Sequence, residues 1–74
     1  MEKLIAYFRR TYAVVITDRA ARRLVETVHA MEAVDPQVRL GVTGSDAAAL
    51  VPRRVDVTLA ELRAALAGRR HGVA

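Results

Sequence analysis

The stretch RLGVTGSDAAALVPRR, residues 39–54, contains the residue types and spacing that could bind a phosphate. Gly41 and Gly44 bracket a Val-Thr pair, and Ser45 and Asp46 follow before a run of small residues. A phosphate loop presents consecutive backbone N–H groups at the start of a helix. No lysine lies near this stretch, and the carboxylate of Asp46 would compete with a phosphate for the helix dipole. We therefore interpret the glycines as turn residues and Ser45 as a helix cap.

A second stretch, YFRRTY at residues 7–12, combines three aromatic side chains with two arginines. Aromatic rings stack on bases and arginines neutralise phosphates, so this composition suits a single-strand-binding patch. Two other interpretations stay open. Residues 1–10 could form an amphipathic foot on a membrane surface, with Leu4, Ile5 and Phe8 inserted, or the aromatics could fill a core or a dimer seam. The candidate residues for binding nucleic acid or a partner are Tyr7, Arg9, Arg10, Tyr12, Arg53 and Arg54.

Catalytic chemistry finds little support among the titratable residues. The two histidines, His29 and His71, stand in no metal-ligand spacing with another ligand. Asp18, Asp46 and Asp56 could converge at one end of a sheet, but carboxylates after strands also serve as ordinary caps. We expect no enzyme, no metal and no cofactor.

Composition limits the kind of core that the chain can form and indicates its partners and location. The 74 residues contain no cysteine and only three aromatics, although 53% are apolar, so small side chains must fill the core. A chain of this length buries only about 60% of its unfolded surface, which favours a homodimer that completes the core. The net charge is +4, and Lys3 is the one Lys or Arg that is not an arginine. This bias reflects either a GC-rich genome or phosphate and carboxylate partners, which arginine binds with two hydrogen bonds. No stretch approaches the roughly 20 apolar residues of a membrane span, so we expect a cytoplasmic location.

Hydrophobic periodicity predicts four helical segments. They cover residues 2–10, 17–34, 45–51 and 58–68. Thr17 or Asp18 can cap the second segment, which should end before a proline because the residue before proline avoids the helical region. The last segment has the strongest signals, since Thr58 and Glu61 form a capping box and Gly68 supplies a stop.

Three β-branched or alternating stretches predict strands at residues 11–17, 37–43 and 54–57. The first has apolar residues on both faces, which predicts a central strand. The helix between the first two strands is long enough to make them parallel, whereas the direction of the third stays undecided. The sequence therefore predicts an α+β fold in the order α-β-α-β-(short α)-β-α. One domain would span residues 1–68, followed by a frayed basic tail at 69–74.

Two resemblances to known families follow from these motifs. Residues 14–62 resemble the first half of a response-regulator receiver domain, with VVITD at the end of the first strand and RRLVETV and DAAAL in helices. The second half of that fold is missing here, and no phosphotransfer residue carries over. The order LIAYFRR, a strand, a helix ending in VDPQV and two strands is similar to the MinE family of division-site factors. That resemblance implies a dimer that touches a membrane and binds an ATPase.

These observations lead to one preferred hypothesis and two alternatives. The preferred one is a small non-enzymatic regulatory or adaptor module that acts through protein–protein interaction as a homodimer. The first alternative is a basic nucleic-acid-binding module that uses the arginine pairs and the YFRRTY stretch. The second is a MinE-like factor that contacts a membrane peripherally through residues 1–10.

Overall fold

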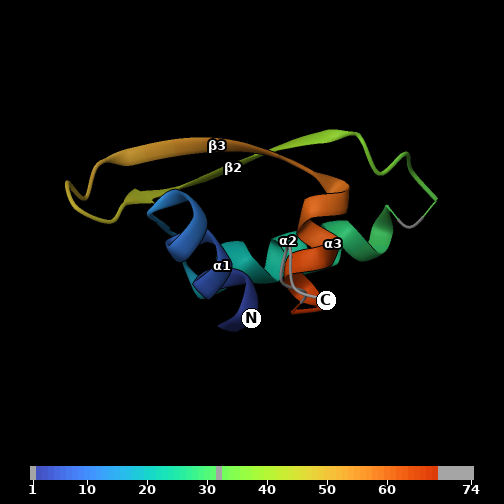
Figure 1. The fold of residues 1–74 in the computed structure, drawn as a ribbon, viewed down its shortest axis with the longest axis horizontal. Coiled ribbons are helices and arrows are strands. Elements are labelled where there is room, and N and C mark those ends of the chain that lie inside the picture. The colour runs from blue at the N-terminus through green and yellow to red at the C-terminus, as the bar shows by residue number, and fades with distance from the viewer. Residues whose placement is uncertain (1, 32, 69–74) are drawn as a thin grey trace.

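The computed structural model describes residues 2–31 and 33–68, so the expected basic tail, which includes His71, lies outside the described residues. Three helices and three strands follow one another along the chain (Figure 1). They are α1 (Glu2–Tyr12), β1 (Val14–Val15), α2 (Asp18–Ala30), β2 (Arg39–Asp46), β3 (Pro52–Thr58) and α3 (Leu59–Leu66). The predicted α+β class is confirmed, while the predicted short helix at 45–51 is wrong.

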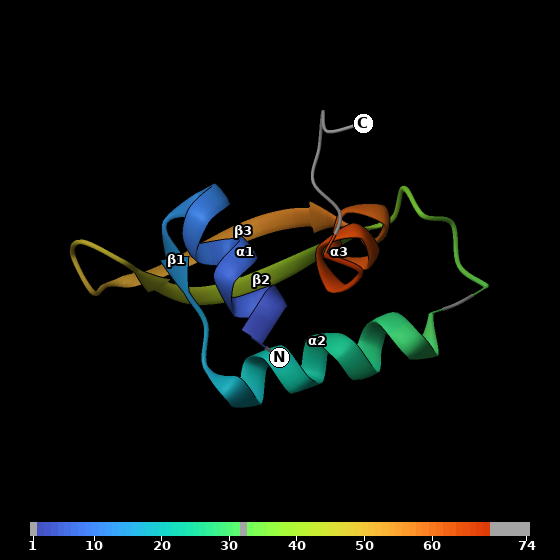
Figure 2. The same cartoon turned by 60° about the horizontal axis from the view of Figure 1, so that its bottom comes forward.

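The sheet has the strand order β1-β2-β3, and both pairings are antiparallel. The first strand is therefore an edge strand and runs antiparallel to the second, which corrects the predicted central, parallel placement. Figure 2 shows the reason: α2 runs along the sheet and delivers the chain to its far end, so β2 must return towards β1.

The first strand is also shorter than predicted, because the chain stays helical through Tyr12. Tyr12 lies one helical turn beyond Phe8, and their ring centroids are 5.8 Å apart. Packing of these two rings holds the last turn of α1 against the core. Ala13 then takes a left-handed conformation, φ 55°, which turns the chain directly into Val14.

Residues 45–51 form the end of β2 and a hairpin turn instead of the expected helix. The Asp46 carboxylate accepts hydrogen bonds from the backbone N–H groups of Ala48 and Ala49, and the N–H of Leu50 donates to the Asp46 carbonyl. Leu50 adopts φ 58°, which closes the turn. An aspartate that bonds its own backbone in this way favours a turn over a helix. The side chain that bonds the following backbone N–H groups is therefore Asp46 and not the predicted Ser45, and it closes a turn instead of starting a helix.

The predicted N-caps Thr17 and Thr58 are confirmed, but the Glu61 carboxylate accepts from two tyrosines of α1 instead of completing the predicted capping box. The Thr17 hydroxyl accepts from the N–H of Ala20, and the Thr58 hydroxyl accepts from the N–H of Glu61. Gly68 has φ 70°, the left-handed conformation that ends many helices. These local signals determine where α2 and α3 begin and where α3 ends.

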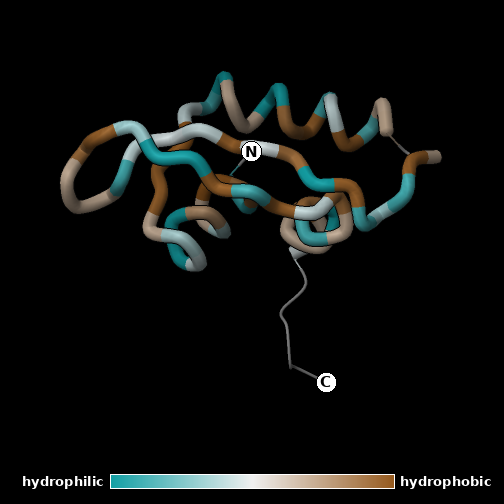
Figure 3. The backbone as a smooth tube through the Cα atoms, turned by 90° about the horizontal axis from the view of Figure 1, so that it is seen from above, coloured by the Kyte–Doolittle hydropathy of each residue, from teal (hydrophilic) through white to brown (hydrophobic). Residues whose placement is uncertain are grey.

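The three helices cover one face of the sheet and leave the other face open (Figure 1). Apolar side chains from the helices and from this face of the strands make up the core. The buried core residues are Leu4, Phe8, Val14, Ile16, Ala21, Val28, Val42, Val55, Val57, Leu59, Leu62 and Ala65. Figure 3 looks down on the open face, where Arg39, Thr43, Arg54 and Asp56 are exposed.

Candidate binding surface

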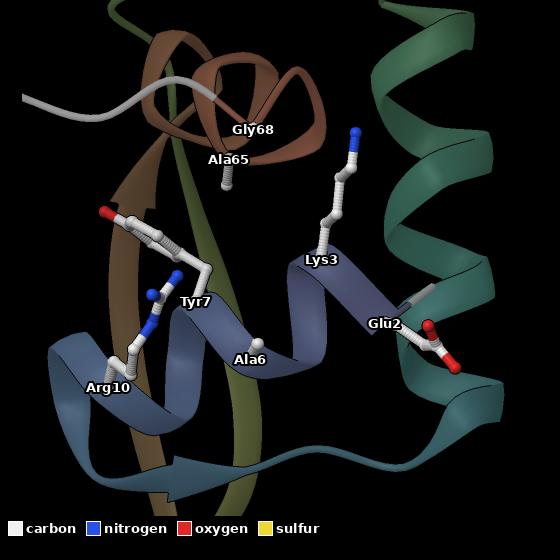
Figure 4. A pocket seen from close by; sticks show the side chains of 7 residues that line it. All are labelled: Glu2, Lys3, Ala6, Tyr7, Arg10, Ala65 and Gly68. Carbon is white, nitrogen blue, oxygen red and sulfur yellow. The ribbon is translucent and has the colours of Figure 1, made fainter.

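A groove runs between the outer side of α1 and the end of α3 (Figure 4). Its volume is about 460 Å³. We call it the α1–α3 groove. Its lining residues are Glu2, Lys3, Ala6, Tyr7, Arg10, Ala65 and Gly68. Residues three and four apart share one side of a helix, so the spacing of Lys3, Tyr7 and Arg10 places all three along the groove.

The α1–α3 groove combines cationic ends with a wall of small residues. Ala6, Ala65 and Gly68 leave backbone and methyl groups facing the space, while Lys3 and Arg10 extend from α1 about two helical turns apart (Figure 4). Within residues 2–31 and 33–68, neither Lys3 nor Arg10 forms an ion pair. Such an arrangement can hold an extended backbone together with a carboxylate or another anion.

Gly68 lies beside the stem of Lys3. A Cβ atom at this position would lie 3.5–3.6 Å from the Lys3 side chain, which is an ordinary van der Waals contact. The positive φ of Gly68, and not a lack of space, favours glycine over residues with a side chain. The end of α3 therefore approaches α1 closely enough to contact the stem of Lys3.

The aromatic residues of the YFRRTY stretch are packed against one another. Phe8 is completely buried, and the ring centroid of Tyr7 lies 5.7 Å from that of Phe8 and 6.2 Å from that of Tyr12. The hydroxyl groups of Tyr7 and Tyr12 both donate to Oε2 of Glu61, which joins α1 to α3. These contacts place the aromatic side chains in the packing between α1 and α3.

Glu61 therefore has a tertiary role that its sequence signal did not reveal. Its backbone N–H completes the cap with Thr58, as predicted, while its carboxylate accepts from two tyrosines that lie 54 and 49 residues away. Burial, followed by the hydrogen bond to Glu61 and the negative charge of that group, raises the pKa of both tyrosines. The three residues form one connected polar cluster beside the groove.

This cluster predicts a loss of stability at alkaline pH. Above about pH 10 the unfolded chain releases tyrosine protons that the folded chain retains, so the stabilisation is complete below that pH and falls as pH rises. The slope is at most about 1.4 kcal/mol per pH unit for each tyrosine. Urea unfolding at several pH values measures it, and a Tyr7→Phe/Tyr12→Phe variant should show a flatter profile. An equally steep profile in that variant would assign the alkaline loss to other groups.

The six predicted binding residues do not form one surface. Tyr7 and Arg10 line the α1–α3 groove, and Arg9 is exposed on α1. Nη1 of Arg53 donates to the Tyr12 carbonyl at 2.7 Å, which brings β3 to the end of α1.

Arg53 and Arg54, two of the six predicted binding residues, form ion pairs away from the α1–α3 groove. Arg53 also lies 3.6 Å from the Asp46 carboxylate. Arg54 lies on the open face of the sheet, where its Nε is 3.3 Å from Asp56. Sequence spacing could have suggested Lys3 beside Tyr7 and Arg10, but no local signal indicates Ala65 and Gly68.

The apolar residues of the predicted membrane foot belong to the core. Leu4 and Phe8 have no exposed surface, and Ile5 is half-buried against the core cluster. A foot that inserted these side chains in a bilayer would have to remove them from the fold. Among the described helices, none has the length and apolar character needed to cross a membrane.

The described residues contain no group of three or more His, Cys, Asp or Glu side chains that could hold a metal ion. No family model, curated protein or solved structure matches this chain significantly.

Proposed function

We propose that this protein is a small non-catalytic interaction module that acts as a homodimer and binds an acidic segment of a protein partner in the α1–α3 groove. The observation that carries the proposal is the pairing of two cations, Lys3 and Arg10, with the small-residue wall between them. Arginine and lysine heads bind carboxylates through charge-assisted hydrogen bonds. The wall of alanine and glycine admits a peptide backbone without displacing large side chains.

A binding titration tests this proposal. A labelled decapeptide of alternating glutamate and alanine is the probe, and fluorescence anisotropy measures its dissociation constant. A Lys3→Ala/Arg10→Ala variant should bind roughly tenfold or more weakly, because it loses two charge-assisted contacts. The matched control is Arg22→Ala/Arg23→Ala, which removes the same charge from exposed positions on α2. Equal weakening of both variants would show attraction by net charge only and would contradict a groove site.

Nucleic-acid binding is a second candidate function, supported by one contact. The bond from Arg53 to the Tyr12 carbonyl places β3 beside the helix end that carries Arg9 and Arg10. A phosphate-binding surface there predicts affinity that falls steeply between about 50 and 200 mM salt. Arg9→Ala, which lies outside the groove lining, should reduce the slope of log affinity against log salt by about one. A flat salt dependence with duplex and single-stranded probes would remove this candidate.

A further inference from the structure

One long edge of the sheet has no partner strand. β3 lies at the end of the strand order and pairs with β2 along its whole length. No strand of the described residues covers its other side. An uncovered edge strand presents a row of backbone donors and acceptors to which another strand can pair.

The hairpin hydrogen bonds identify the groups that face outward. The N–H of Asp46 donates to the carbonyl of Val51 at 2.8 Å, so this opposing pair is hydrogen-bonded. Antiparallel pairs alternate between bonded and non-bonded positions, so residues 53, 55 and 57 direct their backbone groups to β2. Arg54 and Asp56 therefore direct their N–H and C=O groups to the uncovered edge. Pro52 belongs to the same outward set but has no N–H, which limits the ladder at that end.

The side chains on this edge are complementary to themselves. Arg54 and Asp56 lie two residues apart on the open face, with side chains 71% and 55% exposed. If two copies of β3 pair antiparallel about Val55, Arg54 of each copy lies opposite Asp56 of the other. A shift of the register by two residues would place Arg54 opposite Arg54 or Asp56 opposite Asp56. Charge therefore selects one register among the hydrogen-bonding ones.

We infer that two copies of the chain join along β3, centred on Val55, through reciprocal pairs between Arg54 of one copy and Asp56 of the other. The two-fold axis of such a pairing is perpendicular to the sheet, so the helices of both copies cover the same face of one continuous antiparallel sheet. This inference rests on the homodimer of the proposed function and assigns its interface. It leaves the α1–α3 groove to the acidic partner.

Sedimentation equilibrium of the full chain tests the assignment by charge reversal. The unaltered chain should be a dimer. Arg54→Asp and Asp56→Arg should each weaken dimerisation at least roughly tenfold, because each places like charges opposite one another twice. An equimolar mixture of the two single variants should form a heterodimer, and the double variant Arg54→Asp/Asp56→Arg should dimerise like the unaltered chain. Circular dichroism checks that each variant is folded.

Arg39→Asp is the matched control, because Arg39 lies on the same open face but on β2, away from the edge. It should leave the dimer intact. A monomeric unaltered chain would overturn both this inference and the homodimer of the proposed function. A dimer that tolerates both reversals would overturn only the β3 interface. Peptide binding in the groove, measured on the same variants, shows separately whether the proposed acidic partner site holds.

Discussion

A Phe8→Ala variant is expected to lose about 3–5 kcal/mol of folding free energy. Phe8 is the largest fully buried side chain, and its ring contacts those of Tyr7 and Tyr12. Typical values per residue give a domain of this length a total stability of about 4–11 kcal/mol. The substitution should therefore remove a large share of the total stability. Chemical unfolding monitored by circular dichroism measures the loss.

Two further substitutions make this result specific for packing. Phe8→Leu keeps most of the apolar volume and should cost clearly less than Phe8→Ala. Arg9→Ala, at the exposed neighbouring position, should change stability by no more than about 0.5 kcal/mol. If Phe8→Ala proved as stable as Arg9→Ala, the aromatic cluster would not be part of the core, and a stacking function for these rings would return.

Gly44→Ala is expected to destabilise the fold by about 1–3 kcal/mol, because the added methyl group would overpack the place where β1 pairs with β2. A Cβ atom at Gly44 would lie 2.5 Å from the carbonyl oxygen of Val15 and 2.6 Å from Cγ1 of Val14. The first of these atoms belongs to the backbone, so β1 itself would have to move. For a domain of this size, each kcal/mol lowers the melting temperature by roughly 4–8 °C.

Gly41→Ala is the matched comparison on the same strand. A Cβ atom at Gly41 would lie 2.7 Å from the guanidinium of Arg54, which is the far end of an exposed, flexible side chain. This side chain can move at little cost, and alanine in a strand reduces the entropy lost on folding. Gly41→Ala should be neutral or slightly stabilising in thermal melts. Equal losses at both glycines would indicate a general intolerance of β2 instead of close approach by β1.

Local signals predicted α1, α2 and α3 and the N-caps of the last two. Each cap needs only residues within one helical turn, as Thr17 with Ala20 and Thr58 with Glu61 show. The hairpin was missed because the small residues after Asp46 suit a helix by propensity, while the Asp46 carboxylate bonds two N–H groups of a turn. Propensity is a weak guide where a side chain offers the backbone an alternative bond.

The sheet topology and the groove depend on contacts between distant residues. The hydrogen bond from Arg53 to the Tyr12 carbonyl joins residues 41 positions apart, and no sequence pattern in either segment predicts it. The groove likewise needs the end of α3 to lie against α1, which brings Gly68 to the stem of Lys3. The sequence analysis identified Tyr7 and Arg10 on one side of the groove but missed Lys3, and tertiary packing supplied the other side.

An NMR titration tests most directly the central claim that the α1–α3 groove binds an acidic segment. The ¹⁵N-labelled chain is titrated with the glutamate–alanine decapeptide, and the amide shift changes are mapped along the sequence. We expect the largest amide shift changes at Lys3, Ala6, Tyr7, Arg10 and Gly68, with little change on α2. Changes centred on the hairpin at residues 46–54, or spread evenly over all exposed arginines, would contradict the groove as the binding site.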